Sequence, residues 1–192
     1  MAPVALPIRL FKTVRHWEAW LERHGGTSAG VRMRIAKKAG TLTSVTYQEA
    51  LDVALCFGWI DGLKQPLDRH SWLQRFTPRG PRSVWSKINR AKALALIKVG
   101  RMRDAGLAAI RRAKENGQWV SAYDSYRTAK PPADLLRALR ARPRAYATFK
   151  TLSARHRFGV IYRTMTARKP ETRAKRIRDL VARLSKGQEP FS

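Results

Sequence analysis

The chain has 192 residues, a length typical of one domain, and 44% of them are apolar, which is enough to bury a core. A single cysteine, Cys56, excludes an internal disulfide and any multi-cysteine metal site. Forty Lys and Arg against thirteen Asp and Glu give a net charge of +27, which predicts attraction to polyanions.

The stretch Met1–Leu10 lacks a basic leader, and Pro3 and Pro7 interrupt its apolar residues, so we expect no secretory signal. No window approaches the ~18 apolar residues of a membrane-spanning helix. We therefore expect a cytoplasmic protein without a transmembrane segment. Its positive charge is spread along the chain, which leaves two interpretations: contact with nucleic acid or another polyanion, or compositional drift of solvated positions to arginine.

Three elements are predicted before residue 58. Thr13 can cap a helix that ends at Gly25, and residues 31–38 alternate between apolar and basic side chains, as a half-exposed strand does. Residues 46–49 form a capping box that begins a second helix, and Gly58 ends it. The apolar positions of the first helix are Val14, Trp17, Trp20 and Leu21.

The middle of the chain combines turns, a strand and two helices. Asp61-Gly62 is a turn signal, and residues 71–77 are expected to be extended. Ser83 can cap a helix that runs to Val99, and Asp104 begins another that stops at Gly117. Residues 118–130 are interpreted as an ordered loop because aromatic and polar side chains alternate there without helical spacing.

Proline and serine punctuate the C-terminal third. Pro131-Pro132 and Pro143 suit the first turns of two short helices, Ser153 caps a third, and Pro170 opens a last helix that Gly187 closes. No repeat or linker appears. The prediction is a single domain over residues 1–192 of the α+β class, predominantly α-helical, with several short helices around a small antiparallel sheet.

A dense run of unusual residues lies between Cys56 and Asn89. It reads CFGWIDG at residues 56–62, RFTPR at residues 75–79 and WSKIN at residues 85–89. At these spacings the run resembles the YdeI/OmpD-associated family, also described as bacteriocin-protection proteins. Trp17–Leu21, Lys37-Lys38, and residues 167–173 with Arg176 fit further motifs of that family, so the resemblance covers nearly the whole chain.

The resemblance implies a link to bacteriocin or antimicrobial-peptide tolerance and, through the family name, an association with a porin. It implies no reaction. One departure is visible, because Arg32 stands where the family commonly has a tryptophan in its first strand. If that tryptophan lines a site in relatives, the site is altered here.

The central run supplies candidates for an anion pocket. Guanidinium groups clamp carboxylate or phosphate with paired hydrogen bonds, and a helix N-terminus at Ser83 would add unpaired N–H groups. The alternative is that these side chains lock a helix onto the sheet through backbone carbonyls. The candidate residues are Arg75, Arg79, Asn89, Trp59, Asp61, Trp85 and Ser86.

For the aspartate, tryptophan and cysteine side chains of this run, a purely structural role is the alternative to ligand binding. Asp61 can pair with Arg75 or Arg79, or cap its own turn through the backbone. Trp59 and Trp85, with Trp72, can stack on a ring, although tryptophans more often fill cores. Cys56, with no nearby histidine in the sequence, is expected to be a buried, inert thiol.

No catalytic motif, metal-ligand spacing or cofactor fingerprint is present, so no catalytic residue, metal or cofactor is predicted. Three functions stay open. The first is a protective protein that binds an anionic partner without catalysis, and the second is a nucleic-acid binder that uses its basic surface. The third is an enzyme acting on a small anionic metabolite, with Asp61 as proton acceptor.

Overall fold

The structure is a computed structural model that describes residues 5–38, 42–167 and 169–191. Pro3 and, in the C-terminal motif, Arg168 lie outside these residues. The chain divides into two compact units, Met1–Ala122 (unit 1) and Tyr123–Ser192 (unit 2), which are described separately. The single domain expected over residues 1–192 therefore stays a prediction.

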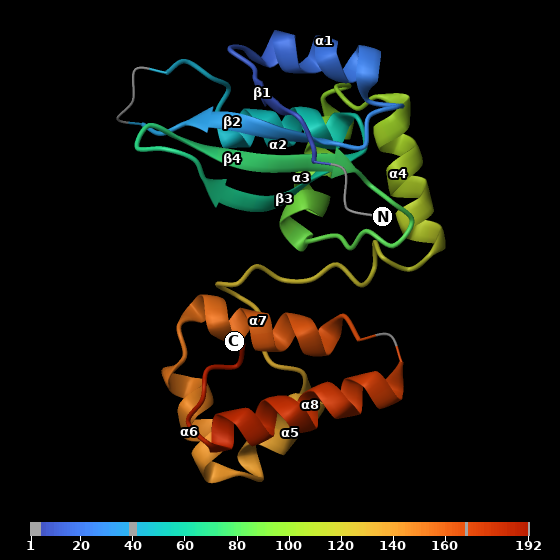
Figure 1. The fold of residues 1–192 in the computed structure, drawn as a ribbon. Helices are drawn as coiled ribbons and strands as arrows, with labels where there is room; N and C mark the ends of the chain where they lie inside the picture. The colour runs from blue at the N-terminus through green and yellow to red at the C-terminus, as the bar shows by residue number, and fades with distance from the viewer. Residues whose placement is uncertain (1–4, 39–41, 168, 192) are drawn as a thin grey trace. The chain divides into compact units, whose positions relative to one another are not determined.

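Unit 1 contains a four-stranded mixed sheet with strand order β1-β2-β4-β3 (Figure 1). The edge strand β1 runs parallel to β2, and the other neighbours are antiparallel. The strands are β1 (Ile8–Leu10), β2 (Val31–Ala36), β3 (Trp59–Pro66) and β4 (Ser71–Pro78). The predicted strands at 31–38 and 71–77 are confirmed.

The predicted turn at Asp61-Gly62 is wrong, because both residues lie inside β3. Asp61 is paired with Phe76, whereas Lys64 is paired with Gln74, so β3 carries one extra residue at this point. Such a β-bulge accepts a glycine within a continuous strand. The Asp-Gly signal therefore marks a bulge rather than a chain reversal.

Four helices of unit 1 follow the predicted pattern. They are α1 (Val14–His24), α2 (Tyr47–Cys56), α3 (Lys87–Lys98) and α4 (Asp104–Glu115). Thr13 caps α1, and the capping box of Thr46 and Glu49 is formed in full at α2. The predicted cap of α3 is wrong: Ser86, not Ser83, accepts from the backbone N–H of Asn89 at 3.0 Å.

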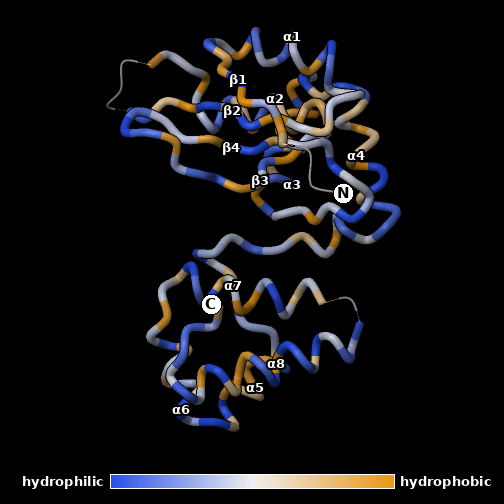
Figure 2. The backbone as a smooth tube through the Cα atoms, viewed as in Figure 1, coloured by the Kyte–Doolittle hydropathy of each residue, from blue (hydrophilic) through white to orange (hydrophobic). Residues whose placement is uncertain are grey.

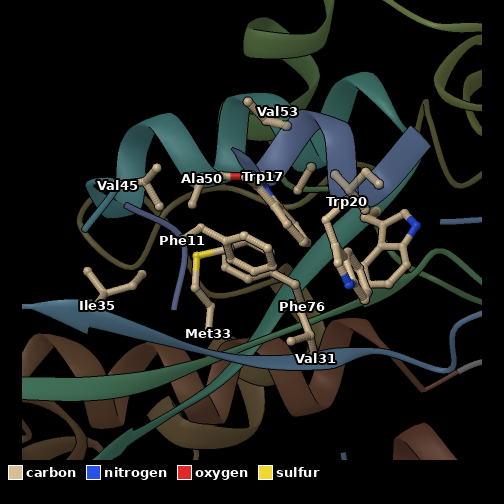
Figure 3. Packing of buried hydrophobic residues seen from close by; sticks show 13 residues of the cluster. Phe11, Trp17, Trp20, Val31, Met33, Ile35, Val45, Ala50, Val53 and Phe76 are labelled. Carbon is tan, nitrogen blue, oxygen red and sulfur yellow. The ribbon is translucent and has the colours of Figure 1, made fainter. Parts of the chain in front are cut away.

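The helices of unit 1 form two layers on one face of the sheet. Val31, Met33 and Ile35 point from β2 towards α1 and α2, and the aromatic side chains of α1 fill the space between (Figure 3). The indole N–H of Trp17 donates to the carbonyl of Ala50 at 3.1 Å, so the core also joins α1 to α2. A second core of α2, α3 and α4 residues packs on the far side of α2.

Unit 2 is a four-helix unit made of α5 (Ala133–Arg140), α6 (Pro143–Thr151), α7 (Ala154–Met165) and α8 (Pro170–Ser185). Hydrophobic and hydrophilic residues alternate along α7 and α8 in Figure 2, and the apolar ones form a separate buried cluster. Arg173 of α8 is half-buried and donates two hydrogen bonds, of 2.6 and 2.9 Å, to the carboxylate of Asp134.

The fold class is confirmed as α+β and predominantly helical, with 49% of the described residues in helices and 15% in strands. Within residues 5–38, 42–167 and 169–191, no helix combines the length and the apolar character needed to cross a membrane.

Candidate functional site

Trp59 belongs to the sheet core rather than to a binding surface. Its side chain is 1% exposed and meets the rings of Trp17 and Trp20 edge-on, with ring centroids 6.0 and 5.8 Å away. Its indole N–H donates to the carbonyl of Gly25 at 3.2 Å. Trp59 thus fills the core, which is the alternative that its residue type favours.

Asp61 joins the sheet to a helix. Its carboxylate accepts a 2.8 Å hydrogen bond from the hydroxyl of Tyr47, the first residue of α2. This contact differs from the predicted ion pair with Arg75 or Arg79, and the strand conformation rules out the predicted turn cap. Asp61 therefore holds the start of α2 against β3.

Arg79, Trp85, Ser86 and Asn89 gather at the start of α3. The guanidinium of Arg79 lies 3.6 Å from the ring centroid of Trp85 and donates to the carbonyl of Val84 at 3.2 Å. Arg79 and Asn89 are 5% and 8% exposed, and Ser86 is used as the helix cap. The cavity beside Arg79 has a volume of about 10 Å³, which is the space of one water molecule.

Arg75 lies apart from this cluster, on β4, and its side chain is exposed. Its guanidinium extends over Gly62 of the β3 bulge: a Cβ atom at Gly62 would lie 2.7 Å from Nε of Arg75. Any larger residue at position 62 would displace this guanidinium. Among the residues that the structure describes, Arg75 makes no hydrogen bond or ion pair.

Arg32 lies directly opposite Arg75 in the antiparallel pair of β2 and β4. Directly opposed residues have Cβ atoms only ~4.5–5.5 Å apart on the same face, where like charges destabilise the sheet. The Nε atom of Arg32 donates to the carbonyl of Leu6 at 2.9 Å, which fixes the half-buried side chain. Arg32, which stands where the resemblance leads us to expect a tryptophan, is thus the direct neighbour of Arg75, a candidate site residue.

The next arginine on this face, Arg34, is neutralised. It donates to the carboxylate of Asp68 at 2.7 Å and to the hydroxyl of Ser71 at 2.9 Å. The pKa of Asp68 falls to about 2, chiefly because the Ser71 hydroxyl donates to its carboxylate, and backbone N–H donors and Arg34 add to the effect. Arg32 and Arg75 have no comparable acid in contact among the described residues.

The thiol of Cys56 is buried, as predicted. Burial raises its pKa, and the positive charge of Arg101 opposes the shift only in part. No group of three or more metal-ligating side chains occurs in the part of the chain that the structure describes. The feature that stands out is the pair of Arg32 and Arg75, which are register partners in the sheet. Their side chains extend to opposite sides, that of Arg32 towards the Leu6 carbonyl and that of Arg75 over Gly62 of β3, and each presents a positive charge that a carboxylate or phosphate could bind.

Sequence reasoning identified Arg75 but missed Arg32 as its partner. Apolar and polar side chains alternate along β2, and this pattern was enough to predict that Arg32 points away from the core. The pairing depends on β2 lying next to β4 rather than next to β3, and on a register of Arg32 opposite Arg75. Neither the strand order nor the register is encoded in a local motif.

Comparisons with known proteins divide the chain near the boundary of the two units. Residues 9–109 match the family model described as a domain of unknown function (DUF8412), and they include the central motifs. Residues 128–187 match the model described as "Bacteriocin-protection, YdeI or OmpD-Associated", which confirms the resemblance for the C-terminal segment. Searches of curated proteins and of solved structures found no match.

Proposed function

This chain belongs to the family of the domain of unknown function DUF8412, and its residues 128–187 are similar to the bacteriocin-protection, YdeI or OmpD-associated family; on this premise we propose a binding function. The protein holds an anionic partner on the exposed face of its sheet. This binding contributes to tolerance of bacteriocins or antimicrobial peptides and needs no catalytic step. The observation that carries the proposal is the Arg32–Arg75 pair.

An anion resolves the electrostatic problem that this pair creates. Like charges on directly opposed residues of neighbouring strands destabilise a sheet. A carboxylate or phosphate of the partner at either guanidinium offsets that repulsion with charge-assisted hydrogen bonds, which are about twice as strong as neutral ones. Gly62 leaves space for the Arg75 guanidinium, and the Leu6 carbonyl holds that of Arg32, so both donors are placed before the anion arrives.

The exposure of Arg75 favours an anionic group carried on a larger partner. Such a group can approach the sheet without entering a closed cavity. The net charge of +27 draws anionic partners from a distance, because summed charge steers diffusional encounter. The family description links its members to bacteriocin protection and to OmpD, and that link supplies the tolerance phenotype in the proposal.

A complementation experiment tests this function. A bacterial strain that lacks the gene receives the wild-type chain, Arg32→Ala, Arg75→Ala or the control Arg82→Ala, and survival in a bacteriocin is measured. Arg82 is exposed in the same unit, and its loss changes the net charge equally. We expect both sheet variants to lose protection while Arg82→Ala retains it.

Circular dichroism of the purified variants separates a loss of binding from a loss of folding. Protection that survives both sheet substitutions in a folded protein would remove the proposal. So would a deletion strain whose sensitivity equals that of its parent.

A further inference from the structure

A second group of arginines lines a groove in unit 2. Arg163 on α7 and Arg176 and Arg183 on α8 surround a volume of about 520 Å³, and Leu180 and Pro190 contribute apolar surface. Small-molecule sites usually enclose ~300–1,000 Å³ and combine apolar surface with a few convergent polar groups. The groove therefore has the size and lining of a site for a small ligand.

Backbone and ring contacts hold the arginines in place. Arg176 donates to the carbonyl of Arg163 at 2.7 Å, which ties α8 to α7 at the groove. The guanidinium of Arg163 lies 4.2 Å from the ring centroid of Phe191 and makes no hydrogen bond with the described residues. Arg183 donates to the carbonyl of Glu189 at 3.2 Å. Guanidinium groups fixed in this way lose little conformational entropy when an anion binds.

Two arginines of the C-terminal motif, Arg173 and Arg176, make different contacts in unit 2. Arg173 binds Asp134 of α5 and the carbonyl of Thr164 of α7, so it fastens three helices together. Arg176, three residues later, lies on the neighbouring part of α8 and lines the groove. The first arginine joins helices, and the second contributes its charge to the groove.

The electrostatics of the groove favour an anion. Three guanidinium groups face one acid, Asp179, and Lys175 binds that carboxylate at 2.7 Å. Unit 2 as a whole carries 18 Lys and Arg against 5 Asp and Glu in 70 residues, a net charge of +13. Both the local donors and the surrounding field thus attract negative charge.

We propose that this groove binds a small phosphate-bearing molecule with hydroxyl groups, such as a sugar phosphate. The phosphate lies between Arg163 and Arg176, which can each give it charge-assisted N–H donors. Asp179 and Thr166 accept hydrogen bonds from the hydroxyl groups; the Thr166 hydroxyl already donates to the carbonyl of Tyr162 at 2.8 Å, so its oxygen faces the groove as an acceptor. Leu180 packs against the carbon skeleton.

Titration calorimetry with ribose 5-phosphate at physiological salt tests the proposal, with ribose as the uncharged control ligand. Because each variant removes a charged donor, Arg163→Gln and Arg176→Gln should each raise the Kd roughly tenfold or more. Arg178→Gln, an exposed neighbour on α8 outside the groove lining, should change it less than about twofold, since only the distant field is altered. Arg75→Ala should leave the Kd unchanged.

We expect the Arg163→Gln variant to fold normally, because the Arg163 guanidinium makes no hydrogen bond with the described residues. A weaker binding of this variant therefore reports on the groove and not on misfolding. An equal rise in Kd for Arg163→Gln, Arg176→Gln and Arg178→Gln would overturn the proposal, because binding would then depend on the overall positive charge and not on the groove. Absence of saturable binding to ribose 5-phosphate would also overturn it. A third contrary result is tight binding of a single-stranded 12-mer DNA that Arg178→Gln weakens as much as Arg176→Gln does.

Discussion

Three arginines on one face of the sheet differ in how their charge is compensated. Arg34 has Asp68 at 2.7 Å and Ser71 beside it, whereas Arg32 and Arg75 are register partners with no acid in contact among the described residues. Neighbouring strands of a sheet avoid directly opposed like charges unless something offsets the repulsion. The uncompensated pair is therefore the residue-level observation that most directly indicates a ligand.

Asp68 should titrate far below an ordinary aspartate. Its carboxylate accepts from the hydroxyl of Ser71, from two backbone N–H groups and from Arg34, and these contacts favour the ionised form and place its pKa at about 2. Because the folded pKa is below the unfolded one, the stabilisation is present above pH ~4 and disappears as the pH falls towards 2. Carbon NMR titration measures the pKa, and Ser71→Ala should raise it more than Lys37→Ala does.

At the scale of elements, close backbone contact joins α2 to α4. A Cβ atom at Gly106 would lie 2.3 Å from the carbonyl oxygen of Cys56, and one at Gly58 would lie 2.6 Å from the carbonyl oxygen of Ala105. Gly58 also adopts a φ of +72°. Glycine at both positions lets the end of α2 rest directly on the first turn of α4.

Gly106→Ala should destabilise unit 1 although helix propensity alone favours alanine by about 1 kcal/mol. The added methyl group collides with backbone, so we expect a loss of roughly 2 kcal/mol or more in the free energy of unfolding. Urea unfolding followed by tryptophan fluorescence measures it. Gly26→Ala, where a Cβ meets nothing within 4 Å, is the matched control and should stay within about 0.5 kcal/mol of wild type. Equal stability of the two variants would refute the close contact.

Local signals in the sequence predicted most elements. Capping residues at Thr13, Thr46 and Ser153 fixed helix starts, because each hydroxyl accepts a backbone N–H of the first turn. We predicted Ser83 as the cap of α3, but Ser86 caps it. Both serines precede the same helix, and the sequence alone does not distinguish which of them begins it. The strand β1 was missed because it has three exposed residues and no alternation to detect.

At the scale of the whole molecule, tryptophan is distributed unevenly. All six tryptophans lie in unit 1, at positions 17, 20, 59, 72, 85 and 119, and unit 2 has none. Tryptophan fluorescence therefore reports on unit 1 alone, whereas helical circular dichroism reports on both units. This difference allows the expectation of a single cooperative domain to be tested without cutting the chain.

Arg173→Ala should lower the free energy of unfolding by roughly 1–2 kcal/mol, because it removes charge-assisted bonds to a partly exposed Asp134 and a bond to the Thr164 carbonyl. A single domain over residues 1–192 requires the midpoints from fluorescence and circular dichroism to fall together. A fluorescence midpoint that stays fixed while the dichroism midpoint drops would contradict it. Arg178→Ala serves as the control.

The candidate site was predictable only in part. Composition and the central motif directed attention to Arg75, but Arg79 and Asn89 turned out to be buried at the start of α3. A sequence motif indicates that its residues belong to one part of a fold, but it does not indicate whether their side chains are exposed or buried. The partner of Arg75 came from 43 residues earlier in the chain, through a strand pairing that no local spacing specifies.

The central claim is that Arg32 and Arg75 both bind anionic groups on this face of the sheet, and the stabilisation of single and double variants by an anion tests it most directly. Unfolding of the wild type, Arg32→Ala, Arg75→Ala and the double variant is followed by tryptophan fluorescence, in sulfate and in sodium chloride of equal ionic strength. We predict that sulfate stabilises the wild type more than chloride does, and that each single substitution reduces this difference because it removes a charged donor. Equal stabilisation of all four proteins by sulfate would contradict the account.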